Sequence, residues 1–432
     1  MIKSFVSNMI KNNVKVVVVA MLSVIVLVTG GDAYCQMTTN SPFTRYGYGQ
    51  IEDGGFSRTQ SMGGTSIAIY SPLHINPANP ATYTSTDSIT FLFEVGVSGL
   101  VSNFKSGDAT KNTFTGRLDY VALQSPITKW LGVSAGLIPF SYVGYDYSVN
   151  DSIVLEGTSS KQFYTQTFQG NGGINQVYLG LTFNLFDYVT FGANGYYMFG
   201  NLTHFRTMTY TQSNLTNYET IVRSQQHVNN FNVRFGLQYH QPIGKSHKLT
   251  LGAIYEFRTK LKGDYELLKF GVDTITAKAN SENYFQMPQM FGVGVTYEYK
   301  NRLTVGADFS MYEFSKAMFE GQTGFLADRM KVAIGAEYIH NPQGRHYVDR
   351  MWWRIGANYR KSYIKVDDGQ TNDFSLTMGI GFPLKTSRTI IHFNMEYGNI
   401  GSQKYAKLQE NYFKFGFSFS LNEMWFVKQK IR

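Results

Sequence analysis

The sequence predicts an all-β fold, a transmembrane antiparallel β-barrel of about fourteen strands. Strand-like segments alternate large apolar residues with polar residues or glycine. Residues 413–421 read Phe-Lys-Phe-Gly-Phe-Ser-Phe-Ser-Leu, and the segments 374–382 and 391–397 repeat the alternation. Successive side chains of a strand point to opposite faces, so each such strand has one apolar face and one polar face. This two-residue repeat is typical of barrels that span a membrane.

Composition supports the same fold class. The chain has 432 residues, with 42 Gly, 30 Tyr and 33 Phe but only 10 Pro. A mean hydropathy of -0.21 argues against a bundle of membrane helices, whereas a barrel needs only every second residue to be apolar. A soluble array of β-sandwiches is the alternative, but it does not explain why aromatic residues recur at both ends of so many strands.

The N-terminus resembles an export signal, which we place at residues 1–35. Lys3, Lys11 and Lys15 precede the apolar run 16–28, and Ala33 stands at the third position before a cut after Cys35. The run is shorter than the roughly 20 residues of a membrane-spanning helix. Cleavage would remove the only cysteine, leaving a mature chain without a thiol. We therefore expect a protein of the bacterial outer membrane.

Alternation and turn signals delimit fourteen strands, with the barrel occupying residues 89–432. The approximate spans are 89–101, 114–125, 131–148, 161–186, 188–212, 218–240, 247–269, 283–299, 302–315, 327–340, 350–366, 371–384, 388–400 and 409–421. Short turns such as 244–245 and 300–301 alternate with longer segments such as 150–160 and 270–282. Short turns belong on the periplasmic side, and an even strand count then puts both termini in the periplasm.

The apolar face of the barrel is expected to contact outer-membrane lipid and lipopolysaccharide. An aromatic girdle at its ends explains Trp130, Trp352, Trp353 and Trp425. The basic residues are scattered along the chain, so a nucleic-acid partner is not expected.

The polar face carries charges of both signs, which are expected to pair inside the lumen. They are Glu94, Asp119, Arg234, Glu256, Arg258, Glu298, Asp308, Glu337, Arg354, Arg360, Glu396 and Lys414. Two carboxylates on one wall could also perform acid–base catalysis, but ion pairing explains these charged residues without an active site. We find no metal-ligand spacing or phosphate-binding loop, and the G-x-S-x-G match at Gly132–Gly136 lies inside the predicted strand 131–148 rather than at a strand-to-helix elbow. No catalytic residue, metal or cofactor is therefore expected, and the protein is predicted not to be an enzyme.

Glycine recurs on the polar face of most predicted strands. The positions are Gly96, Gly180, Gly192, Gly236, Gly252, Gly292, Gly306, Gly335, Gly356, Gly379 and Gly416. Glycine is a poor strand former, so a ring of it indicates that another part of the chain approaches closely. The segment 36–88, between the signal peptide and the first strand, is predicted to fold back into the lumen as a plug. The alternative is that the glycines only relieve crowding and help strands bend.

A motif in this segment resembles a known family. Ser61-Met62-Gly63-Gly64-Thr65-Ser66 is followed by Ile75-Asn76-Pro77-Ala78, after a signal peptide and before a barrel. This order is similar to the N-terminal signature of the long-chain fatty-acid transporter (FadL/TodX-type) family of outer-membrane proteins. The pair Pro139-Phe140, in an early strand, is similar to another pattern of that family. The ending Asn422-Glu423-Met424-Trp425-Phe426 looks like that of Bacteroidota members.

The resemblance implies a fourteen-stranded barrel whose lumen is occupied by an N-terminal hatch. Met62, Gly63, Gly64, Asn76, Pro77 and Ala78 would be hatch residues with structural and gating roles. In that family, hydrophobic molecules are captured outside the cell and leave sideways through a gap at a strand kink. The resemblance thus implies passive uptake of hydrophobic small molecules such as long-chain fatty acids.

A lateral gap also has a physical basis in the residues. Pro139, followed by Phe140, cannot donate to a strand ladder, and Gly170, Gly172 and Gly173 are expected to break the neighbouring strand 161–186. An ordinary bulge is the alternative. A second functional hypothesis is a protein-interaction role, as a barrel of a type IX secretion or surface-attachment complex with a protein partner at its extracellular loops. Transport predicts an apolar pocket between the loops and the hatch.

Overall fold

The computed structural model is a closed antiparallel barrel with the preceding segment inside it, and it describes residues 39–87, 90–154, 161–186, 188–211, 219–271, 274–366, 369–384, 388–402 and 408–424. The barrel and this segment form one compact unit, residues 38–432. The predicted signal peptide lies outside the described residues.

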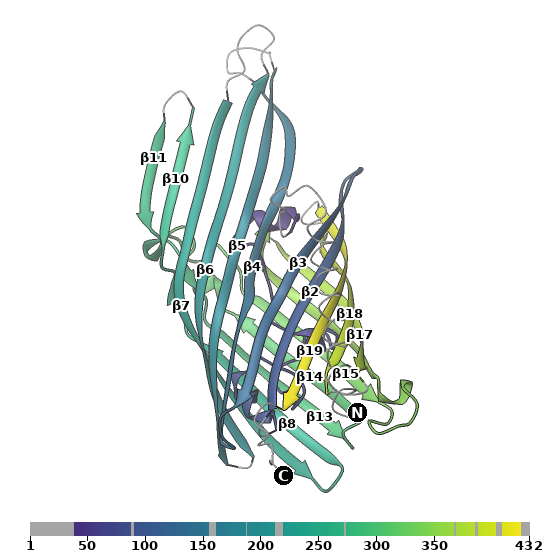
Figure 1. Ribbon diagram of the computed structural model, residues 1–432. Helices are drawn as coiled ribbons and strands as arrows, with labels where there is room; N and C mark the ends of the chain where they lie inside the picture. The colour runs from purple at the N-terminus through teal and green to yellow at the C-terminus, as the bar shows by residue number, and fades with distance from the viewer. Residues whose placement is uncertain are drawn as a thin grey trace, which may run out of the picture. The chain divides into compact units, whose positions relative to one another are not determined.

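Fourteen strands close the barrel in chain order, which confirms the predicted fold class (Figure 1). They are β2 (Thr90–Ser106), β3 (Ala109–Pro126), β4 (Leu131–Val154), β5 (Lys161–Phe186), β6 (Val189–Thr211), β7 (Glu219–Ile243), β8 (His247–Glu256), β13 (Met290–Tyr299), β14 (Leu303–Tyr312), β15 (Arg329–Ile339), β16 (Trp352–Val366), β17 (Gly369–Pro383), β18 (Ile390–Ser402) and β19 (Leu408–Met424). β19 pairs with β2 along the register from Gln409 and Lys105 to Met424 and Thr90. This pairing closes the ring.

The remaining elements are short. They are η1 (Pro42–Arg45), β1 (Gln50–Ile51), α2 (Ser57–Gln60), η2 (Pro80–Ser85), β9 (Thr259–Lys260), β10 (Asp264–Phe270), β11 (Ile275–Asn280), η3 (Ser281–Asn283), β12 (Gln286–Met287), η4 (Phe314–Lys316) and η5 (Val348–Arg350). None of the helices in the described ranges is long and apolar enough to cross a membrane.

Two predicted strands differ from the observed ones. The segment 247–269 divides into β8 and β10, because Gly263 with a φ of 131° redirects the chain and β10 pairs with the upper half of β7. The hairpin of β10 and β11 therefore adds to the wall beside β4–β7, outside the ring of fourteen (Figure 1). The predicted strand 283–299 begins only at Met290, because η3 precedes it and Pro288 has no N–H to donate.

The outer face of the barrel is apolar and the inner face polar, as the alternation predicts. On β5, Leu179 and Leu185 are 60% and 56% exposed, while the intervening Gly180 and Thr182 are buried. On β19, Phe417 is 52% exposed, whereas its neighbours on the other face are buried. The exposed face is thus suited to lipid and the buried face to the hatch. Trp130 and Trp353 are exposed at the short-turn end, and Trp425 lies outside the described residues.

The segment before the barrel fills the lumen, which confirms the plug hypothesis. Nine of the eleven glycines face it so closely that an added Cβ would meet hatch atoms; the exceptions are Gly96, against Tyr120, and Gly416, against Asn394. At Gly356 the Cβ would run into the backbone of Met62 and Gly63. Glycine is needed at these positions because backbone packs directly on backbone.

The substitution Gly356→Ala tests this packing. The added methyl group has to displace hatch backbone, so we expect the free energy of unfolding to fall by about 1–3 kcal/mol. The readout is the temperature at which the folded band is lost in semi-native electrophoresis. Gly116→Ala on β3 is the matched control, since a Cβ there meets nothing within 4 Å. Equal melting temperatures for the two variants would contradict close hatch packing.

Candidate functional site

The first half of the predicted hatch motif turns against the wall formed by β15–β17. Gly63 and Gly64 have φ values of 70° and 80°, which glycine adopts without strain. The Gly63 N–H donates to Thr377 Oγ1 at 2.8 Å, and Lys331 Nζ donates to the Gly64 carbonyl at 3.4 Å. Met62 is fully buried beside them. This turn is therefore fixed by the wall.

The second half of the motif is held on the opposite wall. Asn76 Nδ2 donates to the Ser66 carbonyl at 2.7 Å, which ties the two halves together. The Pro77 carbonyl accepts a hydrogen bond from Asn194 Nδ2 at 3.0 Å, and the Ala78 carbonyl accepts one from Arg234 Nη1 at 3.3 Å. All six predicted hatch residues thus lie in the lumen, and their backbone groups are anchored to the wall or covered by it.

A buried ion triad fastens the hatch helix α2 to the barrel. Arg58 of α2 donates to Glu337 of β15 through Nη2 at 2.6 Å and Nε at 3.0 Å, while Arg354 of β16 donates from Nε at 2.6 Å. The two arginines thus share one carboxylate away from water. Removing that carboxylate would leave two uncompensated guanidinium groups.

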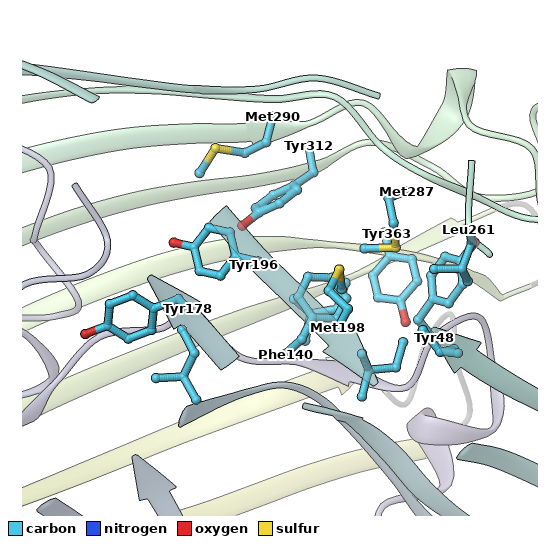
Figure 2. Close-up of a cluster of buried hydrophobic side chains, with 14 of the residues drawn as sticks. Tyr48, Phe140, Tyr178, Tyr196, Met198, Leu261, Met287, Met290, Tyr312 and Tyr363 are labelled. Atoms are coloured by element: carbon cyan, nitrogen blue, oxygen red, sulfur yellow. The ribbon is translucent and has the colours of Figure 1, made fainter. Parts of the chain in front are cut away.

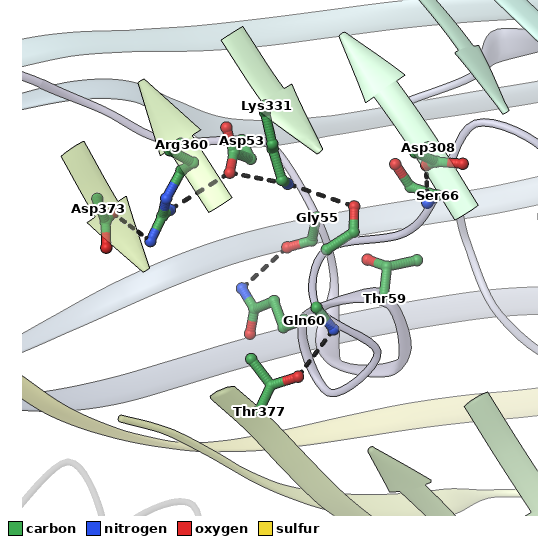
Figure 3. Close-up of polar contacts among 12 residues, drawn as sticks. Asp53, Gly55, Thr59, Gln60, Ser66, Asp308, Lys331, Arg360, Asp373 and Thr377 are labelled. Atoms are coloured by element: carbon green, nitrogen blue, oxygen red, sulfur yellow. Dashed lines mark hydrogen bonds and ion pairs between the residues drawn. The ribbon is translucent and has the colours of Figure 1, made fainter. Parts of the chain in front are cut away.

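A second ion cluster surrounds Asp53 (Figure 3). Its carboxylate pairs with Lys331 at 2.9 Å, with Arg360 at 3.4 Å and with Arg329. Burial alone raises the pKa of Asp53, but the three cations outweigh it and hold that pKa well below its usual range. Asp53 therefore remains ionised and connects the hatch to β15 and β16.

Two predicted lumen carboxylates accept hydrogen bonds from hatch backbone. Glu94 accepts from the N–H of Ile75 at 3.0 Å. Asp308 accepts from the N–H of Ile67 at 2.8 Å and from that of Ser66 (Figure 3). Both act as anchors for the hatch.

The other predicted lumen charges mostly pair within the barrel. Arg234 pairs with Glu256, Arg258 with Glu313, and Glu396 with Arg360, and Asp119 lies near Arg117 and Lys414. Glu298 stands opposite Lys248 in the register of β13 and β8. Within the described residues, no group of three or more His, Cys, Asp or Glu is placed to hold a metal ion.

The barrel wall is interrupted between β3 and β4. Their ladder covers only the register from Val121 and Leu137 to Pro126 and Gly132, although both strands continue well beyond it. Figure 1 shows the two strands diverging above this ladder. The edges of β3 and β4 therefore face each other without direct strand pairing at the end of the barrel opposite Thr90 and Met424, which we call the outer end.

The five predicted gap residues lie on or beside β4. Pro139 and Phe140 form a bulge at which the register with β5 shifts. Contrary to expectation, Gly170, Gly172 and Gly173 do not break the neighbouring strand. β5 runs unbroken from Lys161 to Phe186 and pairs with β4 through all three, because strands on both sides hold this backbone. The wall opens on the other side of β4.

Hatch backbone covers the β4 edge of this opening from inside. Gln50 and Ile51 of β1 pair with Tyr142 and Ser141, and the Glu52 N–H donates to the Phe140 carbonyl at 2.9 Å. Behind this edge lies a cavity of about 60 Å³, with Asp53 and Pro139 among its lining residues. Its charged lining is a poor environment for an apolar molecule.

A larger cavity of about 260 Å³ lies at the outer end, between the start of the hatch and the walls of β4–β7. Its lining is rich in aromatic side chains. The lining residues are Arg45, Tyr46, Gly47, Tyr145, Phe168, Leu202, His204, Phe205, Arg206, Val222, Ser224, Gln226, Tyr265, Phe285, Phe319, Glu320 and Phe325. Its position corresponds to that of the apolar pocket expected under the transport hypothesis, but charged residues such as Arg45, Arg206 and Glu320 also line it.

The floor of this outer cavity is closed by buried rings. Tyr48 of the hatch is fully buried, packs edge-on against Phe319 at 5.2 Å between ring centroids, and donates from its hydroxyl to the Gln286 carbonyl at 3.0 Å. Tyr363 and Phe314 stack below at 4.5 Å. Figure 2 shows Tyr48 and Tyr363 within this cluster. The lining of the outer cavity is therefore continuous, through Phe319, with a cluster of buried rings.

Sequence reasoning missed the charged residues of the hatch, and it did not identify the residues that line the outer cavity. Asp53 and Arg58 have partners roughly 280 to 310 positions away, as for Arg58 with Glu337 and Asp53 with Arg360. No local pattern in the sequence identifies the two members of such a pair. Charge alone indicates that partners exist, because ionised residues in a plug need partners on the lumen wall.

The family of the chain is given by a family model described as BamG, which matches residues 9–432. The chain belongs to the BamG family. Comparison with curated proteins found no match. For this BamG-family barrel, the remaining comparisons are with solved structures.

Several solved barrels share the fold. The Ralstonia pickettii toluene transporter TbuX has a TM-score of 0.54 at 16% identity, covering 85% of this chain and 98% of its own. The P. putida toluene transporter TodX has a TM-score of 0.53 at 14% identity, and the match covers 87% of this chain and 100% of TodX. A Pseudomonas aeruginosa FadL homologue has a TM-score of 0.52 at 11% identity, and the match covers 85% of this chain and 98% of the homologue. The predicted resemblance to FadL/TodX-type barrels is thus confirmed for the fold of this BamG-family member.

The substitution Glu337→Gln tests the ion triad. Because it leaves Arg58 and Arg354 without their carboxylate, we expect a loss of about 3–5 kcal/mol in stability. We also expect higher ion conductance in planar bilayers as the hatch loosens. Glu266→Gln is the control, since Glu266 pairs with Arg223 and Lys278 only at 3.6 Å and is partly exposed; its effect should stay below about 1 kcal/mol. Matching effects would contradict the anchoring role.

The substitution Asp53→Asn gives a pH test. A carboxyl group whose folded-state pKa is lowered stabilises the fold above its unfolded pKa of about 3.9, and this stabilisation disappears as the pH falls toward the folded-state pKa. The melting temperature of the wild type should therefore exceed that of the variant by a constant amount from pH 8 to 5, and the difference should shrink below about pH 4. Asp264→Asn, at an exposed position, should show no such difference. A difference that vanishes near neutral pH would refute the assigned ionisation.

Proposed function

We propose that this BamG-family protein is a non-enzymatic outer-membrane channel for passive uptake of hydrophobic small molecules. The observation that carries the proposal is the aromatic cavity of about 260 Å³ at the outer end, directly above the hatch. Such concave, mainly apolar cavities are the usual sites of small-molecule binding. TodX and TbuX, which share the fold, are toluene transporters by name, and CymD is a monoaromatic hydrocarbon channel.

In this proposal, a molecule enters the outer cavity, moves inward when the hatch near Tyr48 shifts, and leaves through the opening between β3 and β4. The hatch motif residues described above act as a fixed support for the moving part. Since β1 covers the β4 edge of the opening, the described conformation is a closed one. Movement of β1 is therefore the gating step of the proposal.

The proposed orientation places both termini in the periplasm, in the outer membrane of a Bacteroidota-type cell. Support comes from the turns: β7–β8 and β13–β14 are joined by short turns at one end. Thr90 and Met424, the ends of the ring nearest the termini, pair at that same end. Lipopolysaccharide would then surround the end that carries the outer cavity.

The second candidate is a protein-interaction role in a secretion or surface-attachment complex. The observation that favours it is the wall of β4–β7, which continues beyond the opening and is widened by β10 and β11 (Figure 1). In the described residues, β11 pairs only with β10, so its outer edge is available to another strand. A protein partner at this end would use that wall.

Mass spectrometry of molecules that co-purify from the native membrane separates the two candidates. The intact protein is extracted in mild detergent and analysed for bound lipid and protein. Stoichiometric apolar molecules that added oleate or toluene displaces support the channel. A large protein partner without bound apolar molecules supports the interaction role and overturns the channel.

The double substitution Ile51→Cys and Ser141→Cys tests gating. These residues are opposite each other in the β1–β4 register, and antiparallel partners lie within the Cα distance that a disulfide spans. With the mature chain otherwise free of cysteine, oxidation should lock β1 to β4. We expect uptake of labelled oleate and toluene, in a host strain without its own channel, to fall at least about tenfold on oxidation and to recover with dithiothreitol. The single variants are the controls.

Full uptake by the oxidised double variant, with disulfide formation verified by mass, would show that passage does not need β1 to move.

A further inference from the structure

Two arginines in the outer cavity differ from the other arginines of the lumen. Arg45 lies at the start of the hatch and Arg206 on β6, and both line the cavity. Within the described residues, neither is paired with a carboxylate. The arginines deeper in the lumen all pair with a carboxylate: Arg58, Arg117, Arg234, Arg329, Arg354 and Arg360. The barrel thus neutralises its inner cations but leaves two at the mouth uncompensated.

Both guanidinium groups contact the same aromatic ring. The Arg45 guanidinium lies 3.7 Å from the centroid of Phe168, and that of Arg206 lies 5.8 Å from it. The two cations are therefore no farther apart than the sum of these distances. Arg45 is further positioned by a hydrogen bond from Nη1 to the Tyr147 hydroxyl at 3.0 Å. Two cations on one side of the cavity make the local potential positive, which favours an anion beside them.

The other lining groups leave the cavity positive. Glu320 is the only carboxylate among the lining residues, so two arginines face one acidic side chain; Glu320 and Arg206 are both exposed to solvent, and Arg45 is half-buried. His204 is engaged with the Tyr145 hydroxyl at 2.7 Å. The remaining lining is largely aromatic or aliphatic and provides faces for ring stacking. The two arginines and the aromatic lining together match a ligand that has an anionic group and an aromatic ring.

The volume suits a small ligand. A cavity of about 260 Å³ that opens to solvent accommodates a single-ring compound.

We propose that the outer cavity binds compact aromatic carboxylates, with the ring in the aromatic lining and the carboxylate between Arg45 and Arg206. This inference rests on the proposed channel function and narrows its substrate class. It differs from capture of neutral hydrocarbons, because charge as well as apolarity would decide which molecules enter.

The test compares phenylacetate with phenylacetamide, which has nearly the same shape but no charge. Binding to the intact protein in lipid nanodiscs is measured by calorimetry, with toluene as an apolar reference. We expect phenylacetate to bind at least tenfold more tightly than phenylacetamide, which corresponds to about 1.4 kcal/mol. Because the contact is partly exposed, this preference should shrink between 50 and 500 mM salt.

Variants assign the preference to the two arginines. Arg45→Gln with Arg206→Gln should abolish it, while Arg45→Lys with Arg206→Lys should retain part of it. Arg302→Gln, an exposed residue in the β13–β14 turn, is the charge-matched control and should leave the preference unchanged. Retention of the folded band in semi-native electrophoresis shows that each variant is folded.

The outcomes separate this inference from the channel proposal. Equal binding of phenylacetate and phenylacetamide, or a preference that survives in the double Gln variant, overturns the anion site. If toluene binds and phenylacetate does not, the channel stands and the inference fails. If none of the three binds, both fail.

Discussion

Filling the lumen with the chain's own backbone is the constraint on which the rest of this structure depends. A fourteen-strand ring encloses more space than strand side chains of ordinary size can occupy. Here the N-terminal segment takes that space, and it does so by backbone contact, as at Gly356 against Met62 and Gly63. Polar backbone brought into the lumen must find partners. Glu94, Asp308 and Thr377 on the wall provide them.

The positions of the buried charged residues follow from the same constraint. A plug that carries Asp53 and Arg58 into the barrel needs counter-charges at fixed places, and β15 and β16 present them. These pairs give the hatch one position rather than several, because each ion shifted out of register would be buried without a partner. The hatch around Tyr48 is held differently, by ring packing and by hydrogen bonds such as that from the Tyr48 hydroxyl to the Gln286 carbonyl. In the proposed channel, this end of the hatch is the part that moves.

The sequence predicted what depends on local pattern. Alternation in segments such as 413–421 identified the barrel, short turns gave fourteen strands, and glycine on the inner face predicted a plug. The split of 247–269 into β8 and β10 escaped prediction because alternation continues after the chain leaves the ring. Gly172 and Gly173 were expected to break a strand on conformational grounds, but neighbours on both sides hold them in it. The transport hypothesis predicted a pocket between the loops and the hatch. Its residues could not be predicted, because Arg45 and Arg206 come together only in the tertiary structure.

The pairing of β2 with β19 has a consequence for biogenesis. The ring cannot close until the last strand, Leu408–Met424, is present, whereas the hatch comes first in the chain. Its anchors lie far away in sequence, with 279 positions between Arg58 and Glu337 and 314 between Gly63 and Thr377. Contacts of such high order form late and slowly. The hatch therefore cannot reach its anchored position before the strands that carry these partners are in place, so plug docking depends on the C-terminal half of the chain.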